Sequence, residues 1–250
     1  NFHLLFQSGN AEVELKDGEQ TTTVPLAIEV APIRWLASEE WDDPPGPPAR
    51  EHGSVIVDIE GGQAFVFGGT GYSPYLEPFN DAWRYDLATA EWSEVTPGGD
   101  VPAPGGSRRV AHVPGTKIAY LFGGYGGDQG ADIFDDLYRV TVNGEGLDFE
   151  LVPQTDAPPA RFLHGFAYDP ESERFVTFGG AGTGLFDDTW TMTIGADGAT
   201  WTELDLDDAP SNRYGFFSGM DTETSLACSL STLAPITPFG PRSCWTASRL

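Results

Sequence analysis

The chain is poor in lysine, in cysteine and in long apolar runs. Its only lysines are Lys16 and Lys117, and 38 acidic residues stand against 13 Lys and Arg, which gives a formal net charge of −25. Such a charge repels phosphate backbones and anionic lipid headgroups, so we expect no nucleic-acid partner. The apolar runs have the length of a strand and fall short of the roughly 20 residues of a membrane-spanning helix, so we expect no membrane insertion.

The two cysteines, Cys228 and Cys244, lie close to the C-terminal end of the sequence. One pair cannot form a disulfide framework, and no Cys-x-x-Cys motif is present to hold a structural zinc. We therefore expect no metal site and no cofactor. An acidic surface with few lysines favours an extracellular or cell-envelope setting. The sequence starts at Asn1 without a charged and then apolar signal segment, so we expect its N-terminus to be incomplete.

Turn-forming residues are abundant instead. The chain has 31 glycines and 20 prolines, about a fifth of its residues, and they follow no Gly-X-Y period, which excludes collagen. Its hydrophobic content of 40% suffices to fill a large domain and argues against a disordered chain. The composition predicts an all-β protein of short strands rather than long helices.

A repeat of 55 to 56 residues runs through the middle of the chain. FVFGG ends at Gly69, YLFGG at Gly124 and VTFGG at Gly180. After each diglycine come a polar loop, an acidic pair followed by alternating aromatic and polar residues, and a segment that opens with an aromatic residue. The acidic-aromatic segments are 80–87, 135–142 and 187–194, and the opening aromatics are Trp92, Phe149 and Trp201.

Each repeat contains four strand-sized segments rich in β-branched and aromatic residues and bounded by Gly, Pro, Asp or Asn. The turns between them have two to five residues, which suits antiparallel neighbours. Each repeat is therefore predicted to be a four-stranded meander. In the first repeat, the strands are expected at 53–59, 63–68, 82–87 and 91–95.

The diglycine after an apolar strand, the acidic-aromatic strand and the final aromatic strand together resemble the kelch repeat, over roughly residues 47–205. The resemblance implies an all-β fold, a partial kelch-type β-propeller of four-stranded antiparallel blades, because stacking around an axis buries both faces of such sheets. A solenoid or a β-sandwich is the alternative. The expected divisions are 1–46 (a degenerate leading blade or the end of a preceding β segment), blades at 47–97, 98–154 and 155–207, and 208–250 (the start of a fourth blade).

The pattern starts a fourth time at Arg213 and then stops. The tail after Ser225 has no diglycine and no acidic-aromatic strand. A slip of the reading frame near codons 220–230 would explain this, and resequencing would test it; the two cysteines would then carry no chemistry. Closed propellers have about four to eight blades, so we expect the chain to be a fragment.

Arginines recur just before the first strand of each repeat, and we expect them to converge at the mouth of the propeller channel. The resemblance implies that arginines at this part of the repeat capture acidic peptide motifs, and a guanidinium fork holds a carboxylate with two bonds. The alternative is that each arginine pairs with an acidic residue of an adjacent loop. The candidate arginines are Arg50, Arg109, Arg161 and Arg213, and the candidate partners are Asp42, Asp43, Asp156 and Asp208.

The loops after the diglycines vary most in length, and variable loops on a rigid frame are where recognition usually lies. Their tyrosines, Tyr72, Tyr75 and Tyr125, are therefore further ligand-binding candidates.

Two other recurring features are expected to be structural. His52, His112 and His164 follow the arginines once per repeat, which indicates a shared packing or hydrogen-bonding role rather than metal ligation. The acidic pairs Asn80-Asp81, Asp135-Asp136 and Asp187-Asp188 are expected to cap turns by accepting local backbone N–H bonds.

The function predicted from these features is a non-catalytic binding module that presents a propeller face to a protein or glycan partner. One alternative is an enzyme on a kelch propeller that acts on a sugar or small organic substrate. Resemblance to galactose oxidase would require a cysteine linked to tyrosine in the propeller body, and residues 1–227 contain no cysteine, so a copper-radical oxidase is excluded. The third hypothesis is that the chain is part of a structural repeat protein of the cell surface.

Overall fold

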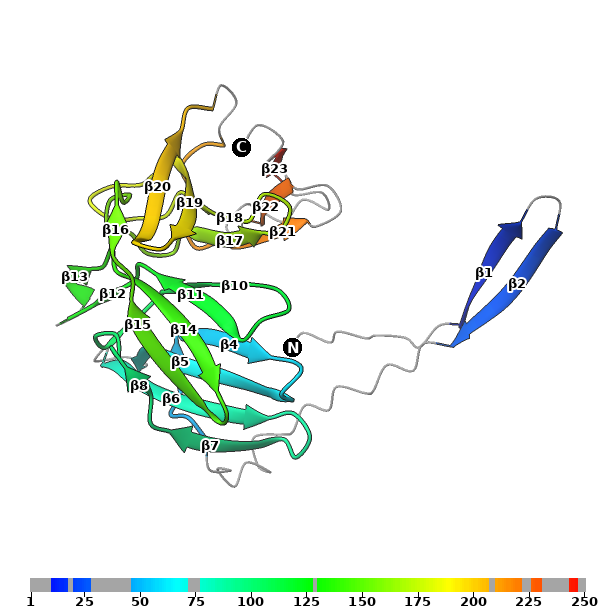
Figure 1. The fold of residues 1–250 in the computed structure, drawn as a ribbon, viewed down its shortest axis with the longest axis horizontal. Helices are drawn as coiled ribbons and strands as arrows, with labels where there is room; N and C mark the ends of the chain where they lie inside the picture. Colours follow the sequence, from blue (N-terminus) through cyan, green and yellow to red (C-terminus); the bar gives the residue numbers. More distant parts are fainter. Residues whose placement is uncertain are drawn as a thin grey trace, which may run out of the picture. The chain divides into compact units, whose positions relative to one another are not determined.

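The computed structural model of the protein contains strands and no α-helix in the part of the chain that it describes (Figure 1). The described residues are 10–17, 20–27, 46–71, 77–127, 130–206, 210–221, 226–230 and 243–246. The search of these residues for a helix long and apolar enough to cross a membrane found none. The chain divides into two units, Asn1–Pro44 and Pro45–Leu250.

The first unit contains one antiparallel hairpin. Its strands are β1 (Asn10–Asp17) and β2 (Gln20–Ala27), and the pairing runs from Asn10 opposite Ala27 to Asp17 opposite Gln20. The prediction that residues 1–46 form a degenerate leading blade stays open, because this hairpin is all that is described of the segment.

The second unit contains three four-stranded antiparallel sheets, which we call blades 1, 2 and 3, and a fourth sheet of three strands. Blade 1 has β4 (Ser54–Asp58), β5 (Gln63–Gly71), β6 (Pro78–Asp86) and β7 (Glu91–Val95). Blade 2 has β10 (Arg109–His112), β11 (Ile118–Phe122), β14 (Leu137–Asn143) and β15 (Gly146–Leu151). Blade 3 has β17 (Gly165–Asp169), β18 (Arg174–Phe178), β19 (Thr189–Gly195) and β20 (Gly198–Leu204). The fourth sheet has β21 (Phe217–Asp221), β22 (Leu226–Leu230) and β23 (Ser243–Thr246).

The predicted four-stranded meander is confirmed in all three blades, because the strands pair in chain order. Short strands join the blades in a way that the sequence pattern did not show. The linkers after blades 1 and 2 pair in parallel with the last strand of the next blade, Gly98 opposite Asp148 and Gln154 opposite Ala199. These linker strands are β8 (Gly98–Gly99) and β16 (Gln154–Thr155), and the remaining short strands are β3 (Arg50–Glu51), β9 (Gly105–Gly106), β12 (Tyr125–Gly126) and β13 (Asp132–Ile133).

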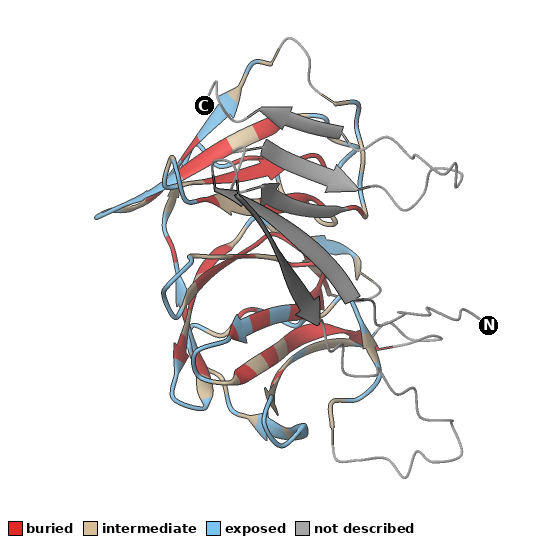
Figure 2. Cartoon of the chain, turned by 90° about the vertical axis from the view of Figure 1, so that its right-hand side faces the viewer, coloured by how far each residue is buried: buried red, intermediate tan, exposed pale blue. Residues whose placement is uncertain are grey.

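The core lies between consecutive blades. Alternation along each strand sends one apolar row to each neighbouring blade. Phe67 of blade 1 packs on Phe149 of blade 2 at 4.5 Å between ring centroids, and Tyr120 of blade 2 packs on Phe175 of blade 3 at 4.8 Å. Figure 2 shows the buried residues, in red, concentrated on strands of these sheets. Burial between successive sheets is the packing of a propeller.

The first strands of the blades neighbour one another in chain order: β10 contacts β4 and β17, and β17 contacts β21. This arrangement is an open partial propeller, as predicted, and it excludes the alternative of two facing sheets in a sandwich.

The diglycines lie where consecutive blades meet. Gly124 N–H donates to the Arg161 carbonyl and Gly180 N–H to the Arg213 carbonyl, each at 2.8 Å. Gly179 has φ +61°, and a Cβ there would lie 2.8 Å from the Arg213 carbonyl oxygen. Only glycine tolerates both this backbone conformation and this approach, so the sequence signature of the repeat is a signature of blade contact.

Candidate binding face

An arginine precedes the first strand of blade 1 and is fully engaged within that blade. Arg50 donates to both carboxylate oxygens of Asp81, at 2.6 and 2.7 Å, and to the Gly68 carbonyl at 2.9 Å. Its guanidinium lies 4.6 Å from the ring centroid of Phe79. Trp83 Nε1 donates to the same Asp81 carboxylate at 2.8 Å. We call this arrangement the arginine pin.

Blade 3 repeats the arginine pin. Arg161 donates to both oxygens of Asp188 at 2.7 Å and to the Gly179 carbonyl at 3.0 Å. Its guanidinium lies 4.5 Å from the Phe186 ring, and Trp190 Nε1 donates to Asp188 at 2.7 Å. The side chain of Arg161 is 0% exposed. A ligand carboxylate would have to displace Asp188 to reach it.

Blade 2 has only part of the arginine pin, the carbonyl bond and the aromatic ring, and builds it from a different backbone position. Strand register places Gly105 where blades 1 and 3 have the pinning arginine, and Arg108 reaches in from three residues further on. Arg108 Nη1 donates to the Gly123 carbonyl at 3.0 Å, and its guanidinium lies 4.3 Å from the Phe134 ring. Burial lowers the pKa of Arg108, against the opposing influence of Tyr138 and Asp136.

The acidic pairs therefore act differently from expectation. Asp81 and Asp188 accept from arginine and tryptophan side chains in addition to a backbone N–H, so local backbone capping is only part of their role. Burial alone would raise the pKa of Asp188, but the hydrogen bonds from Arg161 and Trp190 outweigh burial and lower that pKa. The pKa of Asp81 is lowered in the same way by Arg50 and Trp83. The predicted loop partners Asp42, Asp43 and Asp208 lie outside the described residues, and the partner that Arg161 takes is Asp188 rather than Asp156.

Arg109 has a different environment from the pinned arginines. It begins β10 beside the diglycine of blade 2, and its Nη2 reaches the Phe216 carbonyl at a long 3.4 Å. Its Nε is buried and has no hydrogen-bond partner, and no ion pair to Arg109 exists within the described residues. Burial lowers its pKa. Phe216 directly precedes β21 of the fourth sheet, so Arg109 reaches from blade 2 to the start of that sheet.

His164 lies beside this cation. Both of its ring nitrogens are buried without a partner, and its ring centroid is 5.3 Å from that of Phe122. Burial and, to a smaller extent, the charges of Arg161 and Arg109 place its pKa well below the usual 6.5. A neutral imidazole and a guanidinium with no anionic partner among the described residues therefore share the diglycine end of the blades.

The three histidines do not share one repeat position, which corrects the expectation from sequence. The register aligns His52 with Ser107 and Leu163, and His164 with Arg108. His112 is the one with a blade-linking hydrogen bond, because its Nε2 accepts from the Val57 N–H at 3.0 Å. Within the described residues, no group of three His, Cys, Asp or Glu side chains is placed to hold a metal ion.

The remaining candidates lie around the same end. Tyr125 is half-buried, with its ring 5.9 Å from His52 and 5.3 Å from Phe162. Arg213 Nε donates to the Ser211 carbonyl at 3.1 Å, as Arg50 Nε donates to the Pro48 carbonyl and Arg161 Nε to the Pro159 carbonyl. Tyr72 and Tyr75 lie outside the described residues.

Sequence reasoning missed Arg108 and the Asp81 and Asp188 partners. A signal for the aspartates was present: an aspartate stands two residues before a tryptophan in the acidic-aromatic strands of blades 1 and 3. The repeat period also places Gly105, and neither Arg108 nor Arg109, at the position of Arg50 and Arg161, so the spacing already indicated a change in blade 2.

Comparisons with known proteins agree with this architecture. A family model described as the kelch motif matches residues 61–99. Kelch domain-containing protein 2 is 28% identical in mouse over 151 residues, 52% of this chain and 36% of that protein, and 28% identical in human over 169 residues, 55% and 41%. The chain thus spans about two fifths of the length of these relatives.

Solved structures share the fold at low identity. The structure of YjhT has a TM-score of 0.53 and 15% identity, covering 88% of this chain and 65% of that one. The cryo-EM structure of RAG in complex with one melted and one unmelted RSS has a TM-score of 0.55 and 16% identity, covering 73% and 59%. The threefold repeat, the packing of the blades and the kelch motif matched at residues 61–99 show kelch-type repeats arranged as part of a β-propeller.

Proposed function

We propose that the chain is a non-catalytic binding module that presents the diglycine end of its blades to a protein partner carrying a carboxylate. Kelch repeats commonly mediate protein binding, which supports a protein rather than a glycan as the partner. The residues proposed to contact it are Arg109, Tyr125, Arg213, Tyr72 and Tyr75.

The unpaired guanidinium of Arg109 carries the proposal. A partly buried cation costs desolvation energy and is normally compensated by an anion. Arg50 and Arg161 have such an anion in Asp81 and Asp188, whereas Arg109 has a single long bond to a carbonyl. A carboxylate of a partner would supply the missing charge and accept two bonds from the guanidinium fork.

The pins support the same proposal by fixing the frame. Arg50 and Arg161 are held by bonds within their blades, so the loops after the diglycines project from a rigid base. Variable loops on a fixed frame are the usual arrangement for recognition. We assign Arg50 and Arg161 to holding the face, and Arg109 to contacting the partner.

Selection from a displayed library of random peptides, with the 250-residue chain as bait, tests this function. We expect enrichment of peptides with Asp, Glu or a free C-terminal carboxylate, and at least about tenfold weaker binding of a selected peptide to the Arg109→Gln variant. The Arg174→Gln variant, which changes an arginine at the start of β18, should bind as the unaltered chain does. Enrichment that is indifferent to Arg109, or binding to glycans and not to peptides, would contradict the proposal.

A further inference from the structure

A glutamine side chain joins blades 1 and 2 at the end of the sheets away from the diglycines. Gln63 Oε1 accepts from Arg84 Nε at 2.7 Å, and its Nε2 donates to the Gly144 carbonyl at 2.8 Å. Gln63 is only 4% exposed. The amide thus satisfies an arginine of one blade and the hairpin turn of the next with a single planar group.

The corresponding place between blades 2 and 3 has the arginine but not the amide. Register aligns Arg139 with Arg84, since each is the third-strand partner of a buried aromatic, Tyr120 or Phe65. Ile118 stands where blade 1 has Gln63, at the start of the second strand. Arg139 Nε is consequently buried without a partner, and its Nη1 reaches only Glu150, at 3.5 Å.

A cavity of about 370 Å³ occupies this place. It is lined by Tyr120, Arg139, Glu150, Val152, Pro153 and the turn at 194–198. That turn corresponds to the 142–146 turn of blade 2, so Ala196 stands at the position of Gly144. The contact between blades 2 and 3 therefore has an arginine and a hairpin turn that correspond to the two groups that Gln63 joins between blades 1 and 2. A cavity, rather than an amide, lies between them.

We propose that this cavity binds a primary carboxamide, such as a glutamine side chain of a partner or a small free amide. The carbonyl oxygen accepts from the Arg139 guanidinium, and the NH₂ group donates to a backbone carbonyl of the 194–198 turn. Val152, Pro153 and Ile194 provide apolar surface for the alkyl stem. The volume lies within the range of ligand pockets and exceeds that of a few waters.

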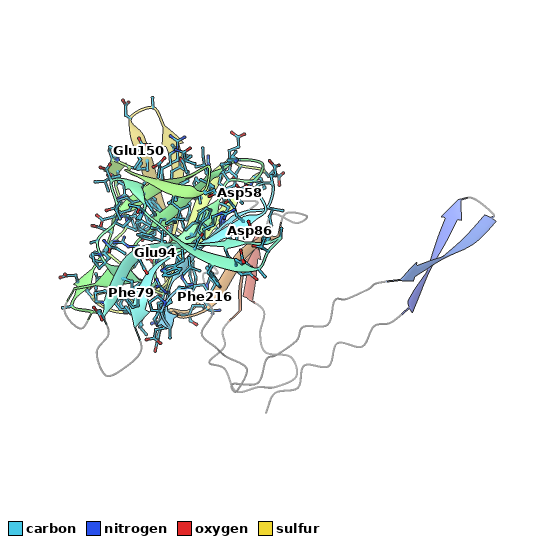
Figure 3. All side chains as sticks on the ribbon, turned by 90° about the horizontal axis from the view of Figure 1, so that it is seen from below. Asp58, Phe79, Asp86, Glu94, Glu150 and Phe216 are labelled. Atoms are coloured by element: carbon cyan, nitrogen blue, oxygen red, sulfur yellow. The ribbon has the colours of Figure 1, made fainter. Side chains whose placement is uncertain are left out.

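The charges around the cavity favour a neutral ligand over a carboxylate. Glu150 and Asp197 stand on its lining beside the single cation Arg139, and the chain carries a net charge of −25. A carboxylate would meet two like charges there, whereas an amide offers the same acceptor without that repulsion. Glu150 lies at the opposite edge of the view from Phe79 and Phe216, which belong to the diglycine end (Figure 3), so this site is separate from the proposed binding face.

Titration of the 250-residue chain with three isosteric probes tests the proposal by NMR. The signals of the Ile194 δ1 methyl and the Arg139 Nε–H are followed as butanamide, butanoate or pentan-2-one is added. We expect saturable shifts with butanamide, and binding about tenfold weaker for butanoate and weaker for the ketone, which accepts but does not donate. Butanoate binding as tightly as butanamide, or no shift with any probe, would overturn the proposal.

Two variants and a control variant make the test specific. Ile118→Gln places an amide from the chain itself in the cavity, so it should abolish the butanamide shift and raise the melting temperature. Arg139→Met should abolish the shift by removing the donor, while Arg174→Met should leave it unchanged. Persistence of the butanamide shift in Arg139→Met would refute the site even if Ile118→Gln fails to fold.

A peptide arm distinguishes the two sources of the amide. Acetyl-Ala-Ala-Gln-Ala-Ala-N-methylamide binding more tightly than butanamide would identify a glutamine of a protein partner as the ligand. Binding of butanamide alone would identify a small free amide.

Discussion

Arg161 and Asp188 are joined by two parallel hydrogen bonds of 2.7 Å, with the arginine side chain completely buried. The pair connects the residue that leads into β17 with the residue that leads into β19, so it fixes the order of strands within blade 3. Because the Arg161 carbonyl also accepts from Gly124 of blade 2, the same residue ties two blades together.

Substitution of this arginine should destabilise the protein strongly. Arg161→Ala leaves the partly buried Asp188 carboxylate without its cation, and breaking such a pair costs about 3 to 5 kcal/mol. Thermal unfolding followed by circular dichroism should show a large fall in melting temperature. Arg174→Ala, at the start of β18 in the same blade, is the matched control and should melt close to the unaltered chain; equal melting of both variants would refute the structural role of the pin.

The pin also shows which parts of this architecture a sequence can reveal. The diglycines, the strand count and the acidic-aromatic strands follow local rules of turn and alternation, so they were predictable. The identity of the arginine that fills this role in blade 2 was not predictable. An arginine side chain is long enough to place its guanidinium at the same point from position 105 or from position 108, and only the strand register distinguishes the two. The pairing of Asp188 with Arg161 spans 27 residues and depends on the same register.

A pair of glycine variants separates the two reasons for glycine in the repeat. Gly123 has φ +65°, and a Cβ there would collide with the Arg161 carbonyl oxygen of the next blade. Gly144 has nearly the same φ, +62°, with no atom within 4 Å of such a Cβ. Gly144→Ala should therefore lower the free energy of unfolding by about 1 to 2 kcal/mol, the cost of a positive φ for alanine. Gly123→Ala should lower it distinctly more, because its Cβ also meets the next blade.

The measurement is the difference in chemical-denaturation midpoint between these two variants. Both variants place alanine at a positive φ, so this cost cancels in the difference. The difference therefore measures the cost of the close contact between the two blades. Equal midpoints would mean that the diglycine serves the turn alone and that the contact between blades yields without cost.

Two histidines should make the stability depend on pH below neutrality. Burial lowers the pKa of His112, and burial with the charges of Arg161 and Arg109 lowers that of His164 further. The unfolded chain then binds more protons than the folded one below the usual value of 6.5, so stability is complete above that pH and is lost as the pH falls. The slope approaches about 1.4 kcal/mol per pH unit for each histidine that stays neutral in the folded state.

Replacement of His164 by the residue found at the same position of the fourth sheet checks this dependence. Phe216 directly precedes β21 as His164 directly precedes β17, so His164→Phe puts an apolar ring where both imidazole nitrogens lack partners. Melting temperatures measured between pH 5 and 7.5 should vary less in His164→Phe than in the unaltered chain. An unchanged slope would show that His164 protonates in the folded state without penalty.

Arg109 should respond to substitution in the opposite direction from Arg161. The Arg161 guanidinium is bonded to the Asp188 carboxylate, so removing the arginine leaves a buried anion without a cation. The Arg109 guanidinium has no anion within the described residues, so removing it relieves the cost of desolvating a charge. Arg109→Met keeps most of the apolar volume of the side chain, so we expect a gain of about 0.5 to 2 kcal/mol in the free energy of unfolding. The same variant should lose the binding of carboxylate peptides. Thermal melts of Arg109→Met and Arg161→Met, with and without a selected peptide, check both signs, and a fall in melting temperature for Arg109→Met would mean that this arginine supports the fold rather than a partner.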